Sequence, residues 1–221
     1  MFSFVAGIVN IAGFLSVQRL TTNITGHFAY VADKVVHRQF GEAAFYCLYS
    51  AFFLLGAFMS NLSMEIVAKR NRKFIYLLPV NVEIAILFVA AALPVVVVQQ
   101  SANMLACMLL FAMGLQNALV TSISNAVVRT THLTGLFTDL GIELSQLFFY
   151  RKPAQQKNLW SSIRLRLSIV SCFFTGCVVG GLGYLRFGLT VLLLAAVCLV
   201  IGLLYDAIRF KILTIRRRLS H

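Results

Sequence analysis

Two short threonine-rich segments hold most of the side chains in this sequence that could bind a polar solute. Thr21–Gly26 reads TTNITG and Thr130–Gly135 reads TTHLTG, so four of the six positions are identical. An amide precedes each segment at a matching place, Asn10 in the first case and Asn117 in the second. Hydroxyl and amide groups donate and accept hydrogen bonds without carrying charge. A helix start beside such groups also favours an anion, so the segments predict a site for a small polar or anionic solute.

The candidate solute-binding residues come from the two segments, the matching amides and nearby ionisable groups. They are Asn10, Thr22, Asn23, Thr25, Gly26, His27, Glu83, Asn117, Thr131, His132, Thr134, Gly135 and Asp139. A structural alternative accompanies them, because polar turns of this kind also cap helices and hold the two halves of a protein together. The sequence leaves both interpretations open.

Ionisable residues near the segments have their own alternatives. Glu83 lies within an apolar run, where an acid is either functional or a hydrogen-bonding partner for a neighbouring helix. Asp139 and Glu143 share one helix face; we expect Asp139 to line a solute pathway and Glu143 to face water. His27 and His132 border the segments and could gate by protonation near neutral pH, or serve as structural hydrogen-bonding residues.

Patterns for metals, cofactors and catalysis are missing from the sequence. The five cysteines lie in apolar runs and none forms a C-x-x-C pair, which argues against a zinc or redox site. There is no H-E-x-x-H, no recognisable nucleophile set and no glycine-rich phosphate loop. We therefore expect no metal, no cofactor and no enzymatic activity.

Composition points to the membrane. Of the 221 residues, 60% are hydrophobic and 12% are charged, with a mean hydropathy of +0.87. A soluble domain has roughly 25% charged residues, so this chain has too little polar surface to face water all round. Lys and Arg number 19 against 7 Asp and Glu, but they cluster between apolar runs, which excludes nucleic acid as the expected partner and indicates a lipid bilayer.

Six apolar runs suit membrane spans, which need about 20 residues each. They lie at 2–20, 42–68, 74–98, 104–128, 165–185 and 187–208. The segments 26–39 and 135–150 are predicted to be short helices that follow the two motifs, with Thr25 as the N-cap of the first. The basic stretch 151–166 contains Pro153 and many polar residues, so we expect a surface loop there.

Charge and repetition together predict the topology. Basic residues concentrate at 69–73, between 129 and 166 and beyond 209, which favours a multi-pass inner-membrane protein with both termini in the cytoplasm. The chain is then an all-α single membrane domain, 1–221, whose repeats 1–101 and 102–221 hold three spans each. An odd number of spans inverts the second repeat relative to the first.

A further sequence match extends this repeat beyond the motifs. Gly176–Gly180 reads GCVVG and aligns with Gly56–Ser60, 120 residues earlier. Small residues at this spacing allow close helix contact. The contact could join two chains into a homodimer or serve packing within one chain.

Interrupted helices at matching places of an inverted repeat are typical of transporter binding sites, because irregular backbone at membrane depth must be satisfied by protein or by water in a cavity. We therefore predict a small-solute transporter or permease with its site at the two motifs. The alternative is a non-transporting scaffold or accessory subunit in which the motifs only hold the halves together.

The run from Gly114 to Gly141, GLQNALVTSISNAVVRTTHLTGLFTDLG, resembles the YoaK-like family of uncharacterised bacterial integral membrane proteins. Gly7 to Gly13, followed by Ile24-Thr25-Gly26, is similar to the N-terminal part of that family. Where the family often has an acid in its first helix this chain has Asn10, and where it often has Asn after T-G this chain has His27. The resemblance implies a shared membrane fold, names no substrate, and implies that any proton coupling through an acid at the first place does not occur there in this chain.

Overall fold

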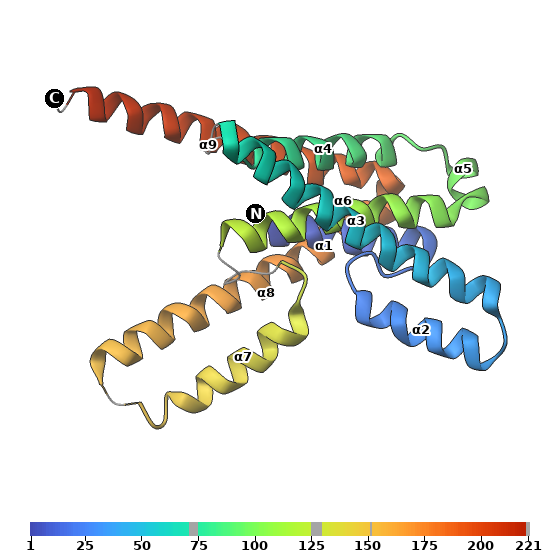
Figure 1. Cartoon of the computed structure of the whole chain (residues 1–221), viewed down its shortest axis with the longest axis horizontal. Coiled ribbons are helices and arrows are strands. Elements are labelled where there is room, and N and C mark those ends of the chain that lie inside the picture. The colour runs from blue at the N-terminus through green and yellow to red at the C-terminus, as the bar shows by residue number, and fades with distance from the viewer. Residues whose placement is uncertain (71–74, 125–129, 151, 220–221) are drawn as a thin grey trace.

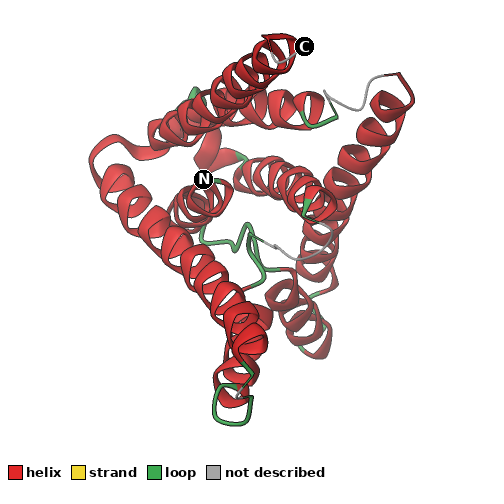
Figure 2. Ribbon diagram, turned by 90° about the vertical axis from the view of Figure 1, so that its left-hand side faces the viewer, coloured by secondary structure: helices red, strands yellow, loops and turns green. Residues whose placement is uncertain are grey.

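The computed structural model describes residues 1–70, 75–124, 130–150 and 152–219, and the secondary structure of these residues is helical without a strand (Figure 2). The elements are α1 (Phe2–Val17), α2 (Ile24–Val36), α3 (Phe40–Arg70), α4 (Leu77–Ala91), α5 (Val95–Gln100), α6 (Ala102–Ile123), α7 (Leu133–Gln146), α8 (Pro153–Phe187), the 3₁₀ turn η2 (Gly188–Val191) and α9 (Leu192–Leu219). The predicted all-α class is confirmed for this part of the chain.

Several helices are suited to a bilayer. By length and composition, three helical stretches among the described residues could cross a membrane: Phe40–Lys69, Ala102–Ile123 and Pro153–Asp206. The last of these contains α8, η2 and the described side chains of α9, and α1 and α4 are shorter apolar helices. Large apolar side chains such as Leu54 and Leu185 are exposed on the outer faces, as lipid contact requires. The described part of the chain is all-helical, and its long apolar helices are those of a membrane protein.

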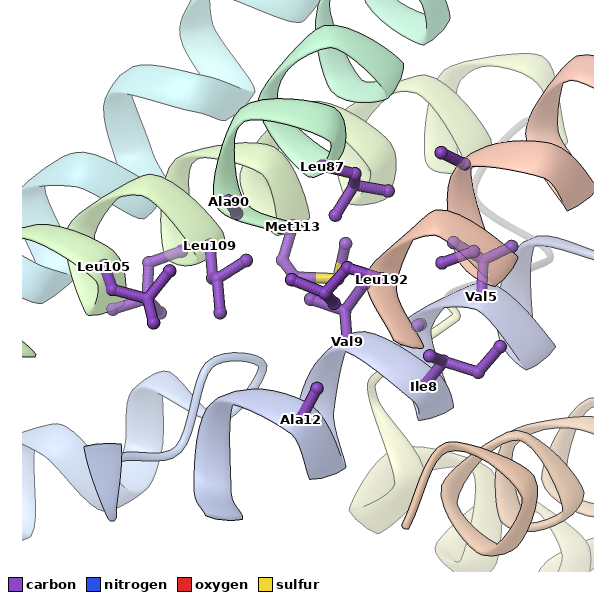
Figure 3. Close-up of a cluster of buried hydrophobic side chains, with 14 of the residues drawn as sticks. Val5, Ile8, Val9, Ala12, Leu87, Ala90, Leu105, Leu109, Met113 and Leu192 are labelled. Atoms are coloured by element: carbon purple, nitrogen blue, oxygen red, sulfur yellow. The ribbon is translucent and has the colours of Figure 1, made fainter. Parts of the chain in front are cut away.

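The core forms around α1, which contacts α6, α8 and α9. Figure 3 shows Ile8, Val9 and Ala12 of α1 beside the buried side chains of α4, α6 and α9, among them Met113 and Leu192. Helix α1 is hydrophobic on most of its circumference, which is why it lies inside the bundle. The segment that follows α1, the first motif, is thereby held close to the centre of the protein.

Glycine brings α1 and α8 into backbone contact. A Cβ atom on Gly7 would overlap the carbonyl oxygen of Phe173, and one on Gly176 would overlap the carbonyl oxygen of Phe4. No other residue type leaves room for this approach. The small-residue face of α8 at Gly176–Gly180 therefore packs within one chain. It gives no support to the predicted homodimer, which stays a prediction.

The contact between α6 and α3 uses the same residue types. A Cβ atom on Gly114 would overlap the carbonyl oxygen of Phe53, and one on Gly56 would overlap the carbonyl oxygen of Phe111. Glycine again meets the carbonyl of a phenylalanine in both directions. These two crossings fix the positions of α3 and α8, the helices that follow the two motif helices.

Two local predictions are wrong. The stretch 151–166 is not a surface loop, because α8 begins at Pro153 and continues without a break to Phe187. A proline in the first helical turn starts a helix well, since its missing N–H would have no partner there anyway. The predicted span 74–98 is broken: α4 ends at Ala91 and α5 begins at Val95, after Pro94, whose ring disfavours helix in the residue before it.

Other predicted boundaries shift by a few residues or lie outside the described ranges. Helices α2 and α7 lie where the sequence predicts the two motif helices, but the N-cap of α2 is Asn23 and not Thr25. Helix α6 ends at Ile123. The predicted end of the fourth span at 125–128 and the basic residues at 71–73 lie outside the described residues.

Candidate functional site

A cavity of about 520 Å³ lies between the two threonine-rich segments. Both segments, the helices that precede them and the helices α3 and α8 contribute to its wall. The lining residues are Asn10, Leu20, Thr22, Asn23, Ile24, Thr25, Phe53, Asn117, Thr121, Thr131, His132, Leu133, Thr134 and Phe173. The volume falls in the range of small-molecule sites, roughly 300–1,000 Å³.

Most of the wall consists of residues in matching positions of the two halves. Six pairs face the cavity: Asn10 with Asn117, Thr22 with Thr131, Asn23 with His132, Ile24 with Leu133, Thr25 with Thr134, and Phe53 with Phe173. The motif residues are 109 positions apart and the phenylalanines 120 positions apart, as in the sequence match. Each half therefore presents the same kinds of group to the cavity.

The first two threonines of the first motif hold it against α1. Thr21 Oγ1 donates to the carbonyl oxygen of Val9 at 3.3 Å, and Thr22 Oγ1 donates to Asn10 Oδ1 at 2.7 Å. Both threonines are buried. A buried polar group without a partner is costly, so these bonds favour one position of the chain beside α1.

The second motif is held against α6 in a similar way. Thr130 Oγ1 and Thr131 Oγ1 both donate to Asn117 Oδ1 at 3.0 Å, and Asn117 Nδ2 donates to the carbonyl oxygen of Met113 at 2.9 Å. Gln116 Nε2 also lies 3.4 Å from Thr130 Oγ1. The matching amides Asn10 and Asn117 thus bind the threonines of their own half.

The third threonine of each motif is different. Thr25 and Thr134 are exposed, line the cavity, and their hydroxyls have no hydrogen-bond partner among the described residues. Each lies one residue inside the start of its helix, where no earlier helical carbonyl can accept its hydroxyl proton. These two hydroxyls are therefore free to bind a molecule in the cavity.

The two helix starts differ in their caps. Asn23 Oδ1 accepts a hydrogen bond from the Gly26 backbone N–H at 3.1 Å, whereas His132 makes no side-chain cap to α7. A Cβ on Gly135 would overlap the His132 ring, whereas one on Gly26 would lie 3.0 Å from Leu20 Cδ1, which a small shift of that side chain would relieve. Gly26 and Gly135 thus shape the site without lining it.

His27 does not line the cavity. Its ring is fully buried against Tyr46 and Tyr49, with centroid distances of 5.8 and 5.4 Å, and its Nε2 lies 2.7 Å from the carbonyl oxygen of Leu20. Burial lowers the pKa of this imidazole, with the nearby charge of Arg19 acting in the same direction. The contacts are those of a neutral histidine that joins α2 to the preceding loop and to α3.

The acidic candidates also lie away from the cavity. Glu83 is fully buried on α4. Asp139 pairs with Arg166 of α8, with 2.7 Å between Oδ2 and Nη1, and its side chain is 47% exposed. Glu143 accepts from Arg166 Nε at 3.0 Å and from Ser162, and its side chain is 13% exposed. The expectation that Glu143 faces water is therefore wrong, and of the two acids Asp139 is the more exposed.

Some lining residues were not among the predicted ones. Phe53 and Phe173 are apolar residues within long apolar helices, and only their 120-residue spacing distinguishes them. The other lining residues outside the predicted set are Leu20, Ile24, Thr121 and Leu133. Within the described ranges, no group of three or more His, Cys, Asp or Glu side chains is close enough to hold a metal ion.

Comparison with known proteins gives a family and no function. A family model described as "Protein of unknown function (DUF1275)" matches residues 1–205. No curated protein and no solved structure matches the chain. The match agrees with the resemblance to uncharacterised YoaK-like proteins, and because it spans nearly the whole sequence, the chain belongs to the DUF1275 family of proteins of unknown function.

Proposed function

We propose that this protein is a small-solute transporter of the inner membrane and that the cavity between the two motifs binds the solute. One observation carries the proposal: a single cavity is lined by both motifs, and each presents one free threonine hydroxyl, Thr25 or Thr134, to it. The other motif threonines are occupied by Asn10, Asn117 and backbone groups. Both free hydroxyls are exposed at the cavity wall, where a bound molecule can reach them.

Three observations support an inverted repeat of three spans in each half, 1–101 and 102–221. The α1–α8 and α6–α3 crossings use glycine and phenylalanine at matching positions. Matching residues of the two halves line the same cavity. In Figure 1 the α2–α3 and α7–α8 hairpins leave the bundle on different sides, one at the lower right and one at the lower left. The basic clusters favour cytoplasmic termini.

The wall of the cavity favours an uncharged polar or anionic solute. Amides, hydroxyls and the His132 imidazole supply its polar groups, and no carboxylate is among the lining residues. A cation would lack a countercharge there. Helices α2 and α7 begin at the cavity, and the partial positive charge of a helix N-terminus is compatible with a negative group.

The test is solute uptake into vesicles that contain the purified protein. A panel of small neutral and anionic solutes is compared for wild type and for the double variant Thr25→Val/Thr134→Val, which removes both free hydroxyls and keeps the β-branched shape. Thr175→Val is the matched control, because Thr175 is exposed on α8 and its hydroxyl donates only to the Ser171 and Cys172 carbonyls of its own helix. We expect uptake by wild type and by the control, and loss of uptake in the double variant.

Two results would count against the proposal. Equal uptake by the double variant and wild type, with equal thermal stability, would remove the motifs from the solute pathway. No uptake of any solute by well-folded wild type would favour the rival function, a non-transporting scaffold or accessory subunit.

Topology has a separate test. Single cysteines replace Arg38 and Gln155, both exposed, in a variant without the five native cysteines. A membrane-impermeant thiol reagent should label position 38 from outside the cell and position 155 only after the membrane is opened. Labelling of both positions from the same side would overturn the inverted arrangement.

A further inference from the structure

Glu83 is a carboxyl group without any partner inside the helix bundle. Its exposed fraction is 0%, and neither of its carboxyl oxygens has a hydrogen-bond partner in the described part of the chain. It lies on the buried face of α4, together with Val80, Leu87 and Ala90 at helical spacing. This is the least expected environment for an acid, because buried acids are normally paired or bound to a metal.

The neighbourhood of Glu83 is apolar. Helix α4 packs against α6 and α9, and also against α3 and η2. Figure 3 shows Leu87, one turn from Glu83, directed toward Met113 of α6 and Leu192 of α9. In the described part of the chain these elements offer no hydrogen-bond donor to either carboxyl oxygen of Glu83.

The elements that pack against α4 carry other ionisable groups. Their described charged side chains are all exposed: Glu42, Glu65 and Lys69 on α3, and Asp206 on α9. The ionisable side chains withdrawn from the surface are Tyr46 and Tyr49 on α3, Cys107 on α6, Cys198 on α9, and Tyr76 at the start of α4. Within the described residues none of them makes a hydrogen bond or ion pair with Glu83.

An ionised carboxylate in such surroundings would be strongly destabilising, because neither protein groups nor water would solvate it. A bound proton removes the charge and most of this cost. Release of that proton requires water at the carboxylate, and therefore requires α4 to move away from α6 or α9. Proton binding and helix packing are thus coupled at this position.

We propose that Glu83 is a proton-binding site and that its proton exchange drives the solute transport proposed above. The part concerning transport rests on that proposed function. Helix α6, against which α4 packs, also carries Asn117, which holds the second motif at the cavity. A movement of α4 against α6 therefore reaches the solute site through one rigid helix. The proton would be the energy source, since Glu83 itself does not line the cavity.

The proton site is tested first, without any solute. Dicyclohexylcarbodiimide is apolar and reacts with protonated carboxyl groups: the acid O–H adds across one C=N bond, and the adduct rearranges to a stable N-acylurea that keeps the mass of the whole reagent. We expect mass spectrometry of the purified protein to find this adduct on Glu83, with less adduct as the pH rises and none in Glu83→Gln. No adduct on Glu83 at any pH, or more adduct from a water-soluble carbodiimide, would overturn the site.

Coupling is tested in vesicles with the panel solute that wild type takes up fastest, and with trapped pyranine to report the internal pH. We expect Glu83→Gln to lose accumulation driven by an acid-outside gradient and to keep solute exchange without a gradient. Glu65→Gln, an exposed acid on α3, is the matched control and should behave as wild type. Gradient-driven accumulation by Glu83→Gln at the wild-type level would overturn coupling, whereas absence of exchange in wild type would instead overturn the transport function.

Discussion

The hairpins α2–α3 and α7–α8 place different chemistry at matching positions. In the first, Tyr30 stacks on Tyr46, with a centroid distance of 5.0 Å and an interplanar angle of 16°. In the second, the positions 109 and 120 residues later hold Asp139 and Arg166, which form an ion pair at 2.7 Å. An aromatic stack in one half thus corresponds to an ion pair in the other.

A neighbouring position differs in the same way. Lys34 pairs with Glu42 at 2.8 Å in the first hairpin, and the side chain of Glu42 is 57% exposed. The matching positions in the second hairpin hold Glu143 and Ser162, which are joined by a hydrogen bond, and Glu143 is 13% exposed. The carboxylate of the polar contact is exposed in the first hairpin and mostly buried in the second.

This difference indicates how each motif helix is held. His27, Tyr46 and Tyr49 form a buried cluster that joins α2 to α3 mainly through ring contacts, with the Arg19 guanidinium 5.3 Å from the centre of the Tyr46 ring. Helix α7 depends on Arg166, which binds the carboxylates of both Asp139 and Glu143. We therefore expect α7 to be the more easily displaced of the two helices at the cavity.

The largest effect is expected from Arg166→Leu. This change leaves the covered carboxylate of Glu143 without its cation, which costs up to about 3 kcal/mol for a pair that is not completely buried. Hydrogen exchange should become faster in α7 and remain unchanged in α2, and the thermal midpoint should fall. Arg164→Leu is the matched control. Arg164 lies on the same helix just before Arg166, is exposed, and has no ion pair among the described residues.

A triple variant, Asp139→Leu/Glu143→Leu/Arg166→Leu, separates charge from shape in this prediction. Removing all three charges should restore most of the lost stability, since buried ion pairs can often be replaced by apolar groups. If the triple variant is as unstable as Arg166→Leu, the ion pairs do not hold α7, and the comparison between the hairpins loses its basis.

A smaller loss is expected from His27→Leu, which gives the first hairpin the residue found at the matching position, Leu136. The carbonyl oxygen of Leu20 would lose its partner Nε2, at a cost of about 1–3 kcal/mol for a buried group left unpaired. Hydrogen exchange should rise in α2 and stay constant in α7. Phe28→Leu, at an exposed position of α2, should change neither helix. Equal protection of α2 in wild type and His27→Leu would contradict the role given to this histidine.

Acid should lower the stability of the first hairpin through the protonation of His27. Burial lowers the pKa of His27 in the folded state, so below about pH 6.5 the unfolded chain binds a proton that the folded chain does not. Stability therefore falls as the pH drops through this value and is fully present above it. The thermal midpoint of wild type should fall between pH 7.5 and 5.5, and that of His27→Leu should fall less. Parallel pH profiles would show that His27 is not the group responsible.

The sequence was informative where a residue and its partner lie in the same repeated unit. Asn10 with Thr22 and Asn117 with Thr131 could be predicted to belong together, because the match between halves marks all four residues. Arg166 could not be placed, since the polar run around Pro153 resembles a loop and its partners are 23 and 27 residues away in another helix. Phe53 and Phe173 are residues that any membrane helix contains, and only the packing of α3 and α8 places them at the cavity.

The smallest effect is expected from Glu42→Gln. Glu42 is 57% exposed and its partner Lys34 is 22% exposed. A pair with one open side contributes little, because water and salt screen it and two flexible side chains must be fixed. The thermal midpoint and the protection of α2 should stay within error of wild type. Glu143→Gln, at the position that matches Lys34, should by contrast weaken the contact of Arg166 and increase exchange in α7, and added salt should enlarge the exchange of α7 in wild type. If the two substitutions have equal effects, α7 depends on charge no more than α2 does, although Glu143 is covered.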